Sequence, residues 1–335
     1  MRPGIWILLA SLVPVGVAGQ LANPGTKPAP RGWTVPRDAD GHPSLDGVWE
    51  NNSATPLERP PQFAQKPRLT DEELAELKRR AGSLFGPDSE AVFGDALYLA
   101  LLNDSKYAGL GSTGTYSQNW LPDRYFENRT SLIVDPPDGR LPPPTAKATR
   151  ARVTARRSGE RADSVQGMSI QDRCIHYGFP DLFAAYMSTY RIVQTPEFVA
   201  MTLEKIHDTR VIPLDGRPHL SSAVPQYLGD SRGHWEGDTL VVDSTNFHPN
   251  GNPMGGYSVL SDENLHLIER FRRTADDTIE YTFTVDNPTM WTRPWTAVIN
   301  WKRSRGEVFE YACHEGNYSL RGMLSAARAE DAARR

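Results

Sequence analysis

The chain has 335 residues, of which 39% are hydrophobic and 23% charged, with 27 Gly and 27 Pro. This composition is near the average for globular proteins and excludes a coiled coil, a collagen-like repeat and a wholly disordered chain. The 37 Lys and Arg residues nearly balance the 41 Asp and Glu residues, leaving a formal net charge of -4. Because neither sign of charge dominates, we expect no nucleic-acid partner.

The N-terminal segment has the pattern of a secretory signal peptide. Arg2 precedes an apolar run over residues 5–18, and the small residues Ala18 and Gly19 end it. The run is too short to cross a bilayer of ~30 Å as a helix. We therefore predict a signal peptide over residues 1–19, a secreted or periplasmic protein, and no integral membrane association after cleavage. A retained N-terminal anchor is the alternative.

The rest of the chain divides into a linker and one domain. Residues 20–44 are rich in Pro, Gly and charged residues, which predicts an extended linker. We expect a single domain over residues 45–335 that opens with a short strand at 45–49. A helical and loop-rich insertion interrupts this domain at about residues 65–165.

The insertion contains clear helix signals. A capping box at Thr70–Glu73 predicts a helix over residues 71–81, and a second helix is expected over 89–102. One strand is predicted at Thr130–Val134. The basic residues between 147 and 161 have no interleaved aromatic residues, so they indicate the solvated face of a helix.

From about residue 189 the pattern changes to short β-branched and aromatic runs separated by turn signals. We predict strands over residues 190–194, 198–204, 209–214, 234–236, 239–246, 265–273, 278–285, 295–302 and 307–313. Several have a period of two, which indicates consecutive antiparallel strands. Because so many strands must protect their edges, we expect an up-and-down barrel or half-barrel, mainly β, with helical insertions. A C-terminal helix over residues 320–333 is expected to pack on its outside or mouth.

Several segments resemble a family of secreted bacterial proteins without an established activity. They are Gly229–Asp243 (GDSRGHWEGDTLVVD), Leu265–Phe271 (LHLIERF), Thr292–Thr296 (TRPWT), Ile192–Pro196 (IVQTP) and Ile212–His219 (IPLDGRPH). The resemblance covers roughly residues 130–318. In addition, the opening Gly47-Val48-Trp49 is similar to lipocalin-like barrels. These resemblances imply export and a lipocalin-like barrel, and they supply no catalytic residues.

The familiar cofactor and metal motifs are weak or missing in the sequence. Gly109–Gly114 reads G-x-G-x-x-G, but its neighbours predict neither the strand before it nor the helix after it that a dinucleotide site requires. Eight histidines are present without a tight spacing of metal donors. We therefore predict no metal site, and the sequence identifies no cofactor.

The strand expected over residues 265–273 carries the most suggestive polar residues. Alternation puts Glu269 on one face with Leu267, and His266 on the other. A carboxylate among apolar neighbours must be paired or have a raised pKa, so Glu269 is either a general acid or base or part of a structural Glu-Arg pair. Asp243 and His266 are its candidate catalytic partners. The two carboxylates can divide the acid and base roles only if both enter one lumen.

Aromatic residues in the β region offer surface for a ring-shaped or sugar-like ligand. The candidates are Trp235, Tyr281, Trp291, Trp295 and Trp301. Packing in the core is the alternative for each. 

The chain has two cysteines, Cys174 and Cys313. Export would place them where a disulfide persists, and a bridge closing so long a loop stabilises a fold by roughly 4 to 5 kcal/mol in the chain-entropy description. We therefore predict a disulfide. Two free buried thiols, or a thiolate metal ligand beside His176 or His314, are the alternatives.

Together these patterns favour a secreted barrel that binds a small, partly apolar molecule in its lumen or mouth. The alternative is an enzyme on the same scaffold: a lyase, isomerase or hydrolase acting on a small metabolite or glycoside, with Glu269 as general acid or base. A structural or envelope-associated interaction module is a third hypothesis. The position of Glu269 and Asp243 relative to a shared pocket discriminates among them.

Overall fold

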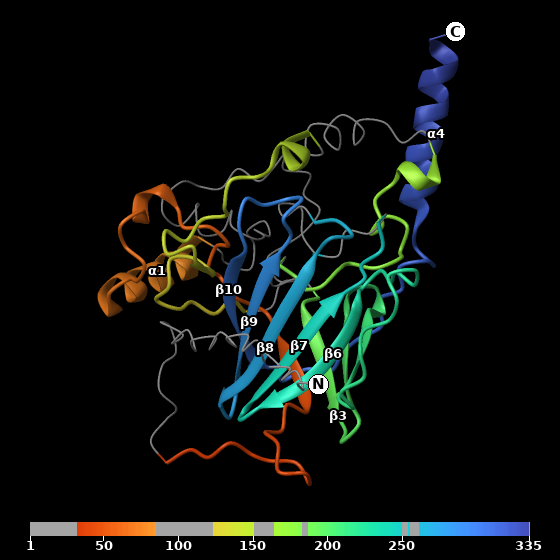
Figure 1. Ribbon diagram of the computed structural model, residues 1–335. Helices are drawn as coiled ribbons and strands as arrows, with labels where there is room; N and C mark the ends of the chain where they lie inside the picture. Colours follow the sequence, from red (N-terminus) through yellow and green to blue (C-terminus); the bar gives the residue numbers. More distant parts are fainter. Residues whose placement is uncertain are drawn as a thin grey trace, which may run out of the picture.

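A computed structural model gives the structure of the protein, which is described for residues 32–84, 123–150, 164–182, 187–249, 254 and 261–334. The predicted signal peptide, the helix expected over residues 89–102 and the G-x-G-x-x-G segment lie outside these residues, as does most of the basic run. Over the described part the protein is mainly β, as predicted (Figure 1).

The described strands form one antiparallel sheet that curls into a nearly closed barrel (Figure 1). They are β1 (Gly47–Glu50), β2 (Ile133–Asp135), β3 (Thr189–Gln194), β4 (Phe198–Leu203), β5 (Thr209–Pro213), β6 (Asp230–Glu236), β7 (Thr239–Thr245), β8 (His266–Ala275), β9 (Thr278–Asp286) and β10 (Trp295–Arg303). Their order is β5-β4-β3-β1-β10-β9-β8-β7-β6, and β2 adds to β10. Apart from β2, each strand lies beside its neighbour in sequence, which confirms the predicted up-and-down barrel.

The barrel wall has a seam between β5 and β6. Hydrogen-bonded neighbours alternate in direction, and the nine strands around the wall are an odd number, so one neighbouring pair must run parallel. In the described chain no backbone ladder joins β5 to β6. Side chains cross the seam instead: Arg210 donates to the Ser231 hydroxyl over 3.1 Å. Ile212 and Leu214 pack directly on Gly233, where a Cβ would lie 2.8 and 2.7 Å from them.

Large aromatic side chains fill the interior of the barrel. Tyr190 stacks on Trp301 with ring centroids 4.1 Å apart, and Phe271 stacks on Tyr281 at 4.7 Å. All four rings are at most 1% exposed. The lumen expected from the sequence is therefore occupied by side chains, as in other small barrels.

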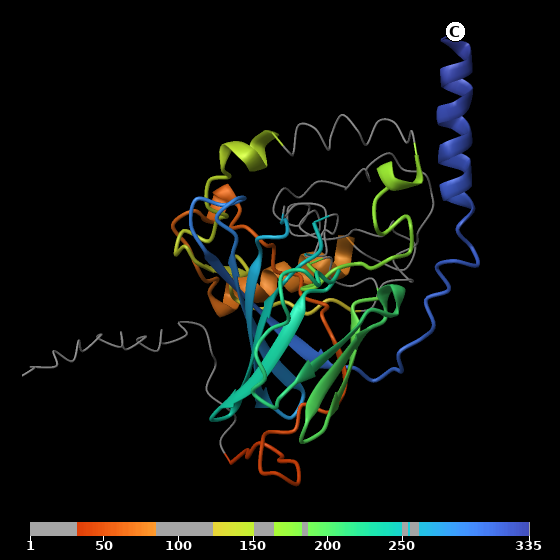
Figure 2. The same cartoon turned by 45° about the vertical axis from the view of Figure 1, so that its right-hand side comes forward.

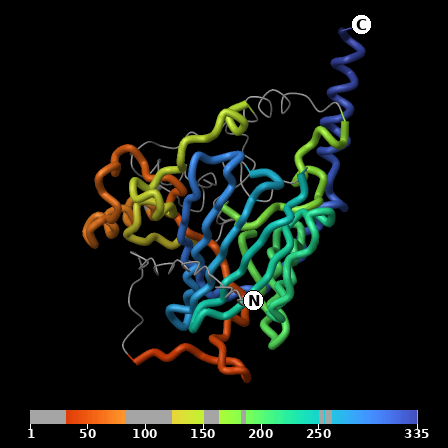
Figure 3. Tube along the Cα trace, in the orientation of Figure 1, coloured from red at the N-terminus to blue at the C-terminus, as the bar shows by residue number. Residues whose placement is uncertain are grey.

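The N-terminal lead-in covers one end of the barrel. Its trace runs beneath the strands in Figure 3. Trp49 donates to the carbonyl of the fully buried Leu45 over 2.8 Å, and Arg273 donates to the Ser44 carbonyl over 3.0 Å. His42 stacks on Trp235 with ring centroids 4.8 Å apart. These contacts join the linker to the end of the barrel.

Phe179 enters the opposite end, which we call the mouth. The mouth is formed by the β4–β5 turn, the start of β6 and the end of β7. Phe179 packs edge-on against Tyr190 at 5.7 Å, and the guanidinium of Arg210 lies 4.3 Å from its ring centroid. Short 3-10 helices occur in the β4–β5 turn, at Lys205–His207, and elsewhere at Pro61–Phe63 and Val165–Gly167.

Helix α1 (Asp71–Leu84) confirms the predicted capping box. The Glu73 amide donates to the Thr70 hydroxyl over 3.2 Å, and the Thr70 amide donates to the Glu73 carboxylate over 2.8 Å. The described segment over residues 123–150 lies along the edge of β10, because Arg129 donates to the Val298 carbonyl over 2.8 Å and the Val298 amide donates to the Leu132 carbonyl over 2.9 Å. Its strand β2 overlaps the one predicted at Thr130–Val134.

The C-terminal segment differs from the prediction. Residues 307–313 form no strand, because both edges of β10 are already taken by β9 and β1.

The predicted disulfide between Cys174 and Cys313 is present. Helix α4 (Tyr318–Ala333) also forms, but it stands clear of the barrel wall instead of packing on it (Figures 1 and 2). Among the described residues, no helix has the length and apolar character needed to cross a membrane.

The close packing at the seam predicts that Gly233→Ala destabilises the protein. The added methyl group must displace Ile212 and Leu214, and such overpacking typically costs about 1 to 3 kcal/mol. Urea denaturation measures the loss. Gly306→Ala is the control, since the nearest atom to its Cβ would be 3.7 Å away. Equal stability of the two variants would contradict a tightly packed seam.

Candidate functional site at the mouth of the barrel

Glu269 lies inside the barrel and is completely buried. Arg210 donates to both of its carboxylate oxygens, over 3.1 and 2.6 Å, and the Tyr281 hydroxyl donates over 2.7 Å. Arg210 also donates to Ser231 and Ser244. A carboxylate held by so many donors and sealed from solvent matches the structural Glu-Arg alternative and offers no access to a substrate.

Asp243 lies on the outer face of the wall. The β7–β8 register pairs Val242 with Glu269 and Asp243 with Ile268, so the two carboxylates point to opposite sides of the sheet. They therefore do not enter one lumen, and the condition for dividing the acid and base roles between them is not met. Asp243 and His266 do meet: His266 Nε2 lies 2.9 Å from an Asp243 oxygen.

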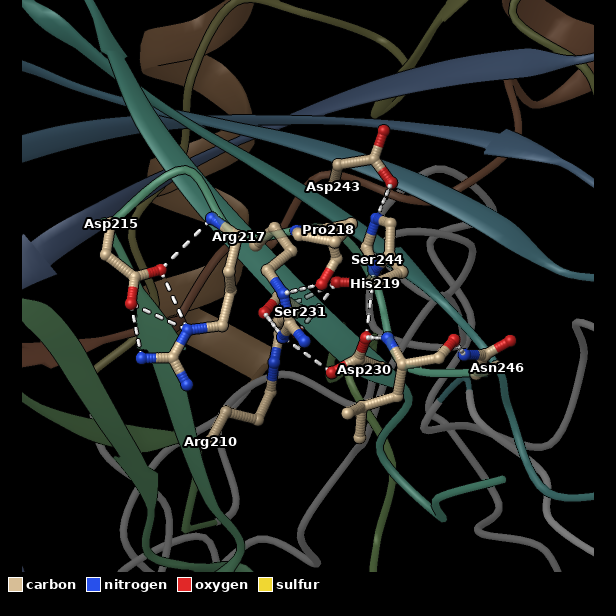
Figure 4. Close-up of polar contacts among 12 residues, drawn as sticks. Arg210, Asp215, Arg217, Pro218, His219, Asp230, Ser231, Asp243, Ser244 and Asn246 are labelled. Atoms are coloured by element: carbon tan, nitrogen blue, oxygen red, sulfur yellow. Dashed lines mark hydrogen bonds and ion pairs between the residues drawn. The ribbon is translucent and has the colours of Figure 1, made fainter. Parts of the chain in front are cut away.

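Asp243 belongs to a chain of alternating acidic and imidazole groups, which we call the rim array: Asp230, His219, Asp243 and His266. His219 lies between two carboxylates, with Nδ1 3.1 Å from Asp230 and Nε2 3.0 Å from Asp243 (Figure 4). Asp230 also accepts from Arg232 over 2.6 Å. The array brings together three strands and the β5–β6 connector at the outer rim of the mouth.

The rim array shifts the proton affinities of its members. The hydrogen bond from His266 holds the pKa of Asp243 below its usual range, and the charge of His219 acts in the same direction. The same hydrogen bond with Asp243 raises the pKa of His266. A half-exposed imidazole oriented by a carboxylate can donate or accept a proton. Within the described residues, no three histidine, cysteine or acidic side chains are arranged to hold a metal ion.

Three aromatic rings lie in contact at the mouth, and two of them are stacked. His248 stacks on Tyr227 with ring centroids 4.5 Å apart, and Tyr227 lies 5.3 Å from the ring of His176. Tyr227 and His248 are half-buried, whereas His176 is 2% exposed. Among the residues that the structure describes, neither ring nitrogen of His176 has a hydrogen-bond partner. We call His176, Tyr227 and His248 the mouth stack.

Burial determines the protonation of His176. Desolvation, together with the nearby His248, lowers the pKa of His176 from 6.5 to about 4. The ring is therefore neutral at neutral pH, with one nitrogen able to donate and the other able to accept a hydrogen bond. Both functions point into a buried region and are unused.

A buried polar web fixes the segment that carries His176. Lys205 donates to Asp181 over 2.7 Å, and both side chains are at most 1% exposed. The Tyr177 and Gly178 amides donate to Asp208, over 2.7 and 3.4 Å, although burial still raises the pKa of Asp208 to about 6. The residues after His176 are thus held to the β4–β5 turn by both backbone and side-chain contacts.

The five predicted ligand-binding aromatic residues do not line a common open site. Tyr281, Trp295 and Trp301 are completely buried in the barrel, and Trp291 is 2% exposed with its ring 6.4 Å from that of Trp295. Trp235 lies at the opposite end, under His42. The core-packing alternative accounts for their positions, because a narrow barrel is filled by side chains of this size.

Sequence analysis missed His176, Tyr227, His219 and Asp230 as site residues. His219 and Asp230 fall inside the segments that resemble the secreted family, but no spacing rule connects a loop histidine to carboxylates on two strands. The available signal was the accumulation of histidines around the strands. Four of them, His176, His219, His248 and His266, do lie near the mouth.

Comparisons with protein-family profiles, curated proteins and solved structures find no match to this chain. The resemblance to a secreted bacterial family and to lipocalin-like barrels therefore stays a prediction. The functional argument rests on the geometry of the mouth.

The buried ion pair predicts a large effect of Glu269→Gln on stability. The substitution leaves the Arg210 charge without its partner, and breaking a buried pair in this way costs about 3 to 5 kcal/mol. Replacing both residues by Met should recover most of the loss, because it removes both charges. Denaturant titration measures each variant. Glu236→Gln, which breaks a half-exposed pair with Arg270, should cost less than about 1 kcal/mol.

The Asp243–His266 hydrogen bond predicts a specific titration. NMR should find the pKa of His266 raised in the wild type and lower in Asp243→Asn, since the amide removes the negative charge. Because the folded state holds this proton more tightly, the pair contributes stability below pH ~6.5 that is lost as the pH rises through the raised pKa. Asp238→Asn, in the β6–β7 turn, should leave the titration of His266 unchanged.

Proposed function

We propose that the protein binds a small, partly apolar molecule at the mouth of the barrel, against His176, Tyr227 and His248. The observation that carries this proposal is the buried imidazole of His176, whose two nitrogens have no partner within the described part of the chain. Leaving a buried polar group unpaired costs about 1 to 3 kcal/mol, so such a group needs an explanation. A ligand that supplies the missing hydrogen bonds is one.

The mouth stack indicates the chemistry of the ligand. The half-buried rings of Tyr227 and His248 adjoin His176 and leave part of their surface open to an apolar group. The neutral His176 ring requires an acceptor and a donor from its partner. A ring-containing molecule with a hydroxyl, an amide or a ring N–H group satisfies both requirements. The lumen is not part of the proposal, because aromatic side chains fill it.

We further propose that the protein works outside the cytoplasm. The signal-like N-terminal segment and the Cys174–Cys313 disulfide support this location.

An acid–base enzyme is the second candidate function. The specific observation in its favour is the 2.9 Å contact between His266 and Asp243, in which the carboxylate orients a half-exposed imidazole. Glu269 has no part in this version, since it is buried and paired. A convex outer wall is a poor place to enclose a substrate, which is why binding at the mouth is preferred.

His176→Phe tests the binding proposal. The phenyl ring fills the same space without polar atoms, so the unliganded variant should be about 1 to 3 kcal/mol more stable than the wild type at neutral pH. A thermal-shift screen of aromatic alcohols and amides should find compounds that stabilise the wild type by about 2.7 kcal/mol at 100 times Kd. These compounds should not stabilise the variant. His234→Phe, on the outer wall, should respond like the wild type.

Two outcomes would contradict the proposal. If the screen finds ligands that stabilise wild type and His176→Phe equally, the ligand does not contact His176. If His176→Phe is less stable than the wild type without ligand, the imidazole is already satisfied in the folded protein.

The lowered pKa of His176 predicts a pH dependence of stability. The unfolded chain binds this proton near pH 6.5 and the folded chain only near pH 4, so stability falls by roughly 3 kcal/mol as the pH falls through this range. Asp208 acts oppositely, because its raised pKa contributes stability that is lost as the pH rises through about 6. Denaturation of Asp208→Asn should therefore show a steeper loss of stability at low pH than the wild type, and adding His176→Phe should remove the part that His176 contributes.

A further inference from the structure

The β5–β6 connector, residues 214–229, lies over the outer side of the seam; we call it the strap. Because β5 and β6 run parallel, the connector must return along the length of the barrel before β6 begins. Its contacts are with the wall beyond the seam. Arg232 on β6 donates to the Pro218 carbonyl over 3.1 Å, and the Leu220 amide donates to Asp230 over 2.7 Å. The strap therefore joins the two sides of the barrel where backbone pairing is missing.

His219 makes the strap's ionisable contacts with the wall. It lies between Asp230 on β6 and Asp243 on β7 (Figure 4). The other charged residues of the strap, Asp215 and Arg217, pair with each other instead. The imidazole thus bonds the strap to two strands on the far side of the seam, in addition to the hydrogen bonds that Asn246 makes with the Leu220 carbonyl and the Gln226 amide.

The contact of His219 with both carboxylates depends on whether both of its ring nitrogens carry hydrogen. Ionised carboxylates only accept hydrogen bonds, so both nitrogens of His219 must carry hydrogen to bond Asp230 and Asp243 together. The imidazolium does this, whereas the neutral ring keeps one bond and places a lone pair against the other carboxylate. Charge-assisted hydrogen bonds of this kind are about twice as strong as neutral ones.

We propose that the strap is a pH-sensitive closure of the barrel seam, in which protonated His219 bonds it to β6 and β7 and loss of the proton weakens this attachment. Without the full His219 contact the first half of the strap opens from the wall more often, while its second half stays bonded through Gln226 to Asn246 and His248. Ser231, which accepts from Arg210 across the seam, directly follows Asp230 in the chain. Opening the strap therefore gives water a route towards the buried Arg210–Glu269 pair.

The neighbouring charges favour such a weakening. Arg232 from β6 faces Asp230, and His266 from β8 faces Asp243, so each carboxylate has a second basic partner besides His219. The lowered pKa of Asp243 keeps its carboxylate ionised over the range in which histidines titrate. The switch therefore lies in the imidazole and not in its acceptors.

Hydrogen exchange measured by mass spectrometry at pH ~5.5 and pH ~8 tests the closure. After correction for the intrinsic rates, amides of the strap should be at least about tenfold less protected at the higher pH in the wild type. The Leu220 amide, which donates to Asp230, is the most direct reporter. His219→Gln, which carries no titrating proton, should have a strap that is weakly protected at both values.

His234→Gln is the matched control, since His234 lies on the outer face of β6 and contacts Glu236 rather than the strap. It should retain the wild-type pH dependence. His266→Gln separates the two histidines that share Asp243, and it should also retain that dependence. The proposal is overturned if the wild-type strap is equally protected at both pH values, or if His219→Gln still loses protection as the pH rises.

Discussion

An odd number of alternating strands cannot form a ring without one parallel pair, and much of this molecule follows from that constraint. The parallel neighbours β5 and β6 share no ladder, so the wall between them depends on Arg210, Gly233 and the connector that returns outside. The connector in turn brings His219 to the carboxylates of β6 and β7. The polar chemistry on the outer rim is therefore a product of the way the barrel closes.

The interior of the barrel contains packed aromatic rings and one buried ion pair. Aromatic rings such as Trp301 and Tyr281 occupy most of the space, which leaves Glu269 and Arg210 as an internal cross-link between β8 and the seam strand β5. A filled barrel has little room for a ligand, so binding moves to its mouth. There, Phe179 seals the interior and His176, only three residues earlier, keeps two unused polar atoms.

The sequence predicted the strands well where alternation was strong, as over residues 278–285, and the capping box at Thr70 also located its helix. The prediction failed where contacts between distant segments of the chain determine the structure. Residues 307–313 look like a strand, but both edges of the preceding strand β10 are already paired. Alternation within a strand is visible in sequence, whereas the register between strands is not, and a single-residue offset puts Asp243 opposite to Glu269. No local pattern predicts that a loop histidine bridges two strands.

The position of the disulfide ties the mouth to the redox state of its surroundings. Cys174 lies two residues before His176, and Cys313 lies just before α4, so one covalent bond anchors both the base of the mouth stack and the C-terminal helix. In an oxidising compartment the two are held as a unit. In a reducing one, the helix would lose its covalent link to the segment before His176, while the contacts of Tyr177 and Gly178 with Asp208 would still hold that segment to the barrel.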